Sequence, residues 1–104
     1  MNNLLNTYEK NSIKLSKKLI KELGLYDALI LAFLADKWGE FGYNDFYYTI
    51  ADLSKETYLS DRMCRKSIQN LINKNILIKT KFQGLPPKQY YTINNKIKGD
   101  LYVK

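Results

Sequence analysis

The chain has 104 residues, enough for one domain with a single modest core, and it contains no histidine and only one cysteine, Cys64. These counts exclude an internal disulfide, the common zinc sites and a nucleophile activated by an imidazole base. The net charge of +7 is uneven, because residues 60–98 carry nine basic side chains against one acidic side chain, whereas residues 1–59 sum to −1.

The sequence also lacks a glycine-rich phosphate-binding loop, so neither an enzyme nor a bound cofactor or metal ion is expected. Its longest apolar run, Ala28–Ala35, is far shorter than the roughly 20 residues of a membrane span. A single cysteine is typical of the reducing cytoplasm. We therefore expect a cytoplasmic protein whose one-sided positive charge binds a polyanion such as nucleic acid.

The first part of the chain predicts an arm and a short helix. Residues 1–12 are polar and rich in asparagine, which indicates a flexible N-terminal arm. An extended piece at residues 13–15 precedes a helix that Ser16 caps. This helix ends at Leu23, because Gly24 is placed to stop it.

The run Tyr26–Trp38 predicts the first long helix, because its apolar residues recur at helical spacing. Gly39 and Gly42 break the pattern, which predicts a loop. Aromatic residues that favour β-structure follow, so a short strand is expected at Phe46–Thr49.

Two capped helices come next. Thr49, with Asp52 three residues later, resembles a capping box at the start of a short helix. Ser60 caps the following helix, and Asn75 suits the left-handed position that ends it. One apolar stripe of this last helix is expected to face the core: Cys64, Ile68, Leu71 and Ile72.

The basic segment after Asn75 predicts a β-hairpin. Residues 76–82 alternate in polarity, Gly84 and Pro86–Pro87 form a turn, and residues 88–94 return as the second strand. The alternation places Ile76, Ile78 and Phe82 on one face, with Lys79 and Lys81 on the other.

Two helices joined by a tight connection and followed by a β-hairpin describe a winged helix-turn-helix, in which the second helix of the pair enters the DNA major groove. The predicted fold is therefore mainly α with a small β-sheet, built as a three-helix core plus a β-hairpin wing. We expect this domain to span residues 13–98, with a C-terminal tail over residues 99–104.

Short motifs in this region carry a family resemblance: a Y-x-I step before the short helix, an S-x₇-I-x-x-L helix, an L-I step and the wing sequence QGLPPKQYY. The matching residues are Tyr48, Ile50, Leu53, Ser60, Ile68, Leu71, Leu77, Ile78, Gln83, Gly84, Leu85, Pro87 and Tyr91. With them the chain resembles the winged-helix region of Gram-positive plasmid and phage replication proteins. Those are plasmid initiators, replisome organisers and DnaD-type primosomal proteins.

The resemblance covers about Ile13 to Asn94. It implies a DNA-binding protein of a mobile genetic element, of phage or plasmid type. Such a protein acts in DNA replication or its control, with replication proteins among its partners.

The candidate site lies on the helix after Ser60 and on the wing. Arginine and glutamine on the exposed face of that helix can reach base edges with paired hydrogen bonds, whereas lysines more often meet phosphate. Duplex DNA is therefore favoured over a single strand. The predicted DNA-binding residues are Arg62, Arg65, Lys66, Gln69, Lys79, Lys81 and Lys88.

Three alternatives remain open. A transcriptional repressor would act as a homodimer that reads two half-sites about one helical turn apart. A protein-binding adaptor or inhibitor would use the same scaffold without nucleic acid. A single-stranded DNA-binding accessory protein would stack bases on aromatic residues of the sheet, namely Tyr47, Tyr48, Phe82, Tyr90 and Tyr91.

Overall fold

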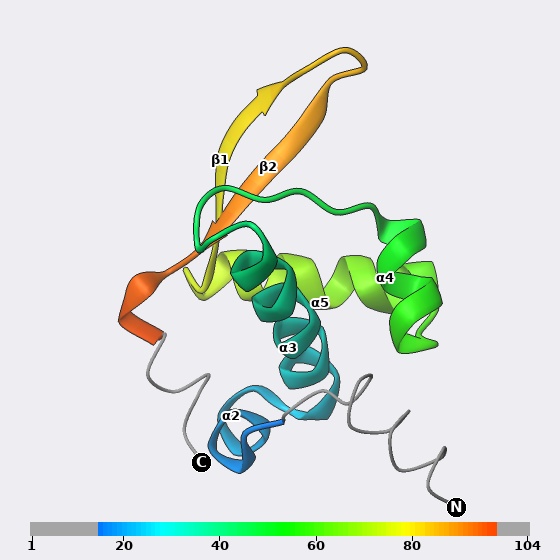
Figure 1. The fold of residues 1–104 in the computed structure, drawn as a ribbon. Helices are drawn as coiled ribbons and strands as arrows, with labels where there is room; N and C mark the ends of the chain where they lie inside the picture. The colour runs from blue at the N-terminus through cyan, green and yellow to red at the C-terminus, as the bar shows by residue number, and fades with distance from the viewer. Residues whose placement is uncertain (1–14, 98–104) are drawn as a thin grey trace, which may run out of the picture.

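The computed structural model describes residues 15–97, and it shows a group of helices from which a β-hairpin projects (Figure 1). The predicted arm over residues 1–12, the tail over residues 99–104 and most of the extended piece at residues 13–15 lie outside this range. Within it, no helix is long and apolar enough to cross a membrane. The elements are α2 (Lys17–Leu23), α3 (Leu25–Glu40), α4 (Ile50–Thr57), α5 (Asp61–Asn73), β1 (Leu77–Gln83), β2 (Lys88–Ile93) and a 3₁₀ turn, η1 (Asn95–Ile97).

Helices α2 and α3 meet at Gly24, as the sequence predicts. The Ser16 hydroxyl caps α2 by accepting a hydrogen bond from the Leu19 amide at 3.3 Å. Gly24 has a φ of 90°, which glycine adopts at little cost. The chain therefore leaves α2 and enters α3 within one residue.

The predicted break at Gly39 is wrong, because α3 continues through Gly39 to Glu40. A single glycine costs a helix only about 1 kcal/mol, and the burial of Trp38 one residue earlier outweighs that cost. The chain reverses later, where the Tyr43 amide donates to the Trp38 carbonyl at 2.8 Å. The Tyr43 ring then packs edge-on against Trp38, with 5.0 Å between ring centroids.

The predicted caps of the last two helices are confirmed. Thr49 Oγ1 accepts from the Asp52 amide at 3.0 Å at the start of α4. Ser60 Oγ accepts from the Met63 amide at 3.1 Å at the start of α5. After α5, Asn75 has a φ of 61°, the left-handed conformation that asparagine tolerates.

The connection between α4 and α5 is held by side-chain hydrogen bonds. The buried Thr57 hydroxyl donates to the Leu53 carbonyl at 2.7 Å and accepts from the Leu59 amide at 3.2 Å. Tyr58, between Thr57 and Leu59, has a left-handed backbone conformation with a φ of 62°. These bonds fix the direction in which α5 leaves the turn.

The strand predicted at Phe46–Thr49 is wrong in extent, because Phe46 alone pairs there. It exchanges two backbone hydrogen bonds with Tyr91 of β2, at 2.8 and 2.7 Å. Thr49 already caps α4, so the chain turns away from the sheet before a second pair can form.

The wing contains a β-bulge that the sequence pattern did not predict. Lys79 lies opposite Tyr91, whereas Lys81 lies opposite Tyr90, so Thr80 is the extra residue of β1. Neighbouring residues of β2 point to opposite faces, and Lys79 and Lys81 therefore do too. The prediction that they share a face is wrong. We call the face with Lys79 and Tyr91 the near face, because it borders α5, and the other the far face.

The predicted apolar face of β1 is wrong for the same reason. The buried residue is Leu77, opposite the buried Ile93, while Ile78 lies opposite Thr92 on the far face. Phe82 lies beyond the bulge and is 69% exposed. Only the base of the wing thus joins the core.

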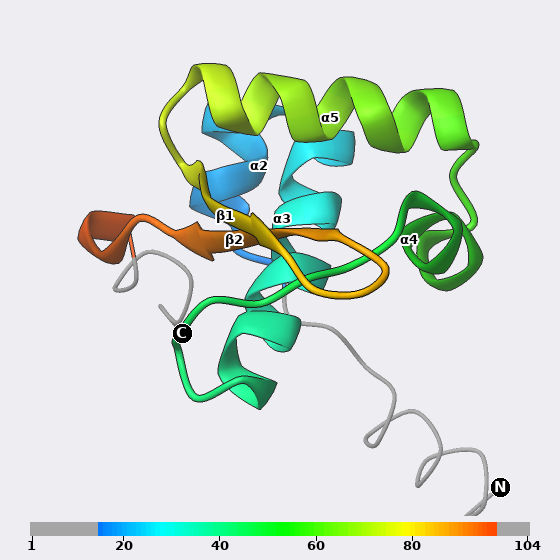
Figure 2. The same ribbon diagram turned by 90° about the horizontal axis from the view of Figure 1, so that it is seen from above.

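Figure 2 looks down on the wing and shows α5 along one side of it, with the connection from α3 to α4 on the other side. The core lies beneath, between α3, α4, α5 and the wing base. The structure is mainly helical with one two-stranded antiparallel sheet, which confirms the predicted winged-helix class. Its buried apolar residues are Leu19, Ala28, Ile30, Leu31, Leu34, Ala35, Trp38, Phe46, Leu53, Cys64, Ile68, Leu71, Leu77 and Ile93.

Candidate nucleic-acid interface

The outer side of α5 presents a polar stripe. Arg62, Lys66, Gln69 and Asn73 are three or four residues apart and all exposed, so they lie one above another on the helix surface. The Gln69 amide nitrogen donates to Asn73 Oδ1 at 2.9 Å, which steadies both side chains. The opposite side of α5 carries the buried residues, and this leaves the stripe facing outward.

A groove of about 350 Å³ separates α5 from the near face of the wing. Arg65 and Gln69 line it from α5, and Lys79 lines it from β1. Two predicted helix residues and one predicted wing residue therefore converge on one concave surface. Its remaining lining residues are mostly apolar: Tyr48, Ile50, Ile68, Ile72 and Tyr91.

The two tyrosines of this groove are stacked. The rings of Tyr48 and Tyr91 have centroids 4.8 Å apart and an interplanar angle of 24°. Burial raises the pKa of the Tyr48 hydroxyl above its ordinary value. A tyrosine hydroxyl is uncharged at neutral pH even without this shift, so Tyr48 adds no negative charge to the groove.

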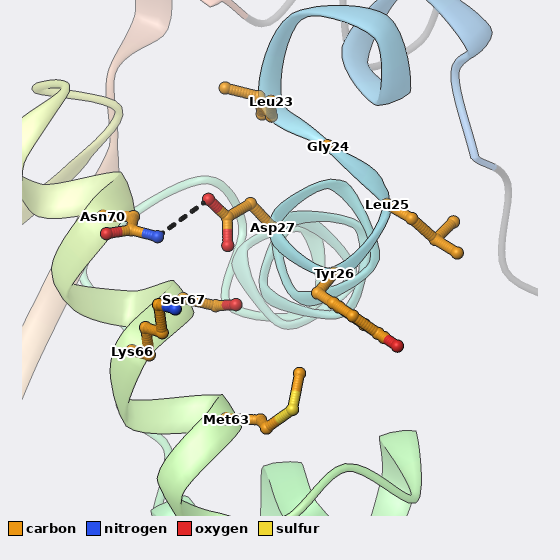
Figure 3. Close-up of a pocket in the computed structure, with 9 residues that line it drawn as sticks. All are labelled: Leu23, Gly24, Leu25, Tyr26, Asp27, Met63, Lys66, Ser67 and Asn70. Atoms are coloured by element: carbon orange, nitrogen blue, oxygen red, sulfur yellow. Dashed lines mark hydrogen bonds between the residues drawn. The ribbon is translucent and has the colours of Figure 1, made fainter.

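Lys66 faces another part of the molecule. It lines a pocket of about 200 Å³ between α5 and the start of α3, together with Tyr26 and Met63 (Figure 3). At the inner end of that pocket the Asn70 amide donates to Asp27 Oδ2 at 3.2 Å, which ties α5 to α3. Lys66 therefore borders this pocket, whereas Arg65 borders the groove beside the wing.

Lys81 and Lys88 lie away from the groove. Lys81 is on the far face, where its ammonium is 3.8 Å from Asp45 Oδ2 and 4.8 Å from the centre of the Tyr90 ring. The Lys88 ammonium lies 4.4 Å from the centre of the Tyr47 ring. Three of the seven predicted residues share the groove, namely Arg65, Gln69 and Lys79. Arg62 and Lys66 lie on the stripe of α5 that also includes Gln69, whereas Lys81 and Lys88 belong to neither group.

We call the other five predicted residues the helix–wing surface: Arg62, Arg65, Lys66, Gln69 and Lys79. Its four cations are exposed, and none of them forms an ion pair with an acidic side chain of residues 15–97. Their positive charges are therefore available to an external anion. The five residues provide three guanidinium or amide groups, which can reach base edges or phosphate, and two ammonium groups, which suit phosphate.

Sequence reasoning did not find every residue around these surfaces. Phe41, which packs edge-on against Tyr47 at 5.8 Å, follows α3 in a loop whose course no local pattern predicts. No cluster of potential metal ligands occurs in the described part of the chain.

No protein-family model and no curated protein matches the chain at a significant level. One solved structure, described as the N-terminal domain of a DNA binding protein, is similar over 94% of this chain and 86% of its own. The TM-score is 0.63 and the sequence identity is 18%. At this identity the likeness shows that the two chains share a fold.

Proposed function

We propose that the chain binds duplex DNA with the helix–wing surface. In this arrangement α5 enters the major groove, and the wing lies over the adjacent backbone. The observation that carries the proposal is the convergence of Arg65, Gln69 and Lys79 on one groove from two elements, with no acidic partner for either cation within residues 15–97. A groove with unpaired cations attracts a polyanion.

The roles differ within the surface. Arg65 and Gln69 have the forked donor and acceptor groups that suit guanine and adenine edges. Arg62, Lys66 and Lys79 suit phosphate, which fixes the position of the protein but carries no sequence information. The similar solved domain comes from a protein described as DNA-binding, and this supports the same class of ligand here.

We propose further that the protein serves a phage- or plasmid-type mobile element, in DNA replication or its control. This rests on the likeness of its helix and wing sequence to the winged-helix region of Gram-positive replication proteins. Replication proteins would then be partners, and no chemistry on the DNA is required of the chain.

A fluorescence anisotropy titration at two salt concentrations tests duplex binding. If three to five phosphates are neutralised, the association constant should fall by roughly 40- to 500-fold between about 50 and 200 mM salt. A single strand of the same sequence should bind the helix–wing surface more weakly, because it has no major groove. A flat salt response, or no binding at the lower salt concentration, would contradict the proposal.

A further inference from the structure

The far face of the wing gathers aromatic and basic side chains that the proposed duplex surface does not use. Tyr47 and Tyr90 are half-buried, and their rings meet edge-on with centroids 5.4 Å apart. Phe41 packs edge-on against Tyr47, with 5.8 Å between the ring centroids. Tyr47 comes from the connection between α3 and α4, which crosses the base of the wing in Figure 1.

A lysine ammonium group lies over the ring of each of the two tyrosines. The Lys88 nitrogen lies 4.4 Å from the Tyr47 ring centre, and the Lys81 nitrogen lies 4.8 Å from the Tyr90 ring centre. The face therefore holds two adjacent units, each made of one π-surface and one positive charge. A nucleotide of a single strand offers the complementary pair, namely one base and one phosphate.

The far face is not part of the surface proposed for duplex binding. The bulge at Thr80 turns Lys81 away from Lys79, and α5 borders the opposite face of the wing. A base can stack on a tyrosine only when its flat surface is uncovered, and in a duplex the neighbouring bases cover it. The far face thus fits unpaired nucleotides.

We propose that the far wing face, formed by Phe41, Tyr47, Lys81, Lys88 and Tyr90, binds an unpaired segment of DNA about two nucleotides long. This goes beyond the proposed duplex binding, and it uses different residues. On binding, Lys81 and Lys88 exchange their contacts with the rings for contacts with phosphate, and the bases take their place on the rings. The exchange is favourable because a cation–π contact at an exposed site is weaker than stacking of a base on an aromatic ring. The ion pair of Lys81 with Asp45 is also exposed and contributes little.

The test uses two variants of the full chain and a labelled oligothymidine of about twelve residues, which forms no duplex. The double variant Tyr47→Leu, Tyr90→Leu removes both ring faces, and we expect about tenfold weaker binding or worse. The matched variant Tyr47→Phe, Tyr90→Phe keeps the rings and should bind like the native chain. Duplex affinity and the thermal unfolding midpoint, measured on the same samples, should change little in both variants.

A third variant separates charge from stacking. Replacing Lys81 and Lys88 with glutamine should reduce the salt slope for oligothymidine by about 1.4, or roughly 0.7 for each phosphate that is no longer neutralised.

Native affinity of the leucine variant for oligothymidine would overturn the proposal. An equal weakening of single-strand and duplex binding would also overturn it, because it would leave no separate surface. Tighter binding of the matching oligouridine would assign the face to RNA and refute the choice of DNA. If duplex binding itself fails while oligothymidine binds as described, only the function proposed for the helix–wing surface is refuted.

Discussion

Replacing Arg65 and Lys79 with alanine is expected to weaken duplex binding by about 100-fold, or ~2.7 kcal/mol. The two side chains line the same groove, one from α5 and one from β1, so the variant removes the helix contact and the wing contact together. Both are exposed and form no ion pair with an acidic side chain of residues 15–97, so their removal should leave the fold intact. Anisotropy titrations at low salt give the change in affinity directly.

A control variant with the same change of charge tests whether position matters. Lys17 and Lys21 are exposed on α2, away from the groove, and their replacement with alanine also removes two positive charges. We expect affinity to fall only a few-fold, since distant charges act weakly through screening salt. Equal weakening in the two variants would mean that net charge, and not the helix–wing surface, holds the DNA.

The largest effect on stability is expected for Phe46→Ala. Phe46 is fully buried, and it joins the connection after α3 to β2 by its two hydrogen bonds with Tyr91. Alanine keeps those backbone bonds but leaves a cavity beside Tyr48 and Tyr91, whose rings lie 6.3 and 6.4 Å away. The free energy of unfolding should fall by about 3–5 kcal/mol, a large share of the stability of a small domain.

Phe82→Ala is the matched control for this prediction. It makes the same chemical change on the wing, but Phe82 is 69% exposed. Its free energy of unfolding should change by less than about 0.5 kcal/mol. Urea unfolding followed by tryptophan fluorescence suits both variants, because Trp38 is buried in the core. Similar destabilisation at both positions would show that the wing is packed differently from the structure described.

Local signals predicted most of the helices. Ser16, Thr49 and Ser60 each bond an amide three residues on, because a hydroxyl at that position satisfies a donor which the helix itself leaves free. Gly24 and Asn75 occur where positive φ angles are needed. These effects act within one turn of chain, so the sequence around each residue contains them.

The features that the sequence patterns predicted wrongly depend on contacts between distant parts of the chain. The bulge at Thr80 depends on how β1 fits against both β2 and the core, and no pattern within β1 reveals it. The single pair of Phe46 with Tyr91 depends on where α4 begins. Gly39 stays helical because α3 must carry Trp38 into the core.

For the candidate site, the sequence predicted the positions on the helix but not those on the wing. Helical spacing alone placed Arg62, Arg65, Lys66 and Gln69 on the exposed part of α5, and the structure agrees. The division of the wing lysines could not be predicted, because a shift of one residue sends every later side chain to the other face. That shift places Lys79 beside the groove and Lys81 on the far face.

Amide chemical-shift mapping tests the central claim most directly. The chain, labelled with ¹⁵N, is titrated with a short duplex at low salt, and the perturbed backbone amides are assigned. If the helix–wing surface binds the duplex, the largest changes will occur along α5 from Arg62 to Asn73 and around Lys79 on β1, with little change in α2. Changes concentrated on α2 and α3, with α5 unaffected, would contradict this claim.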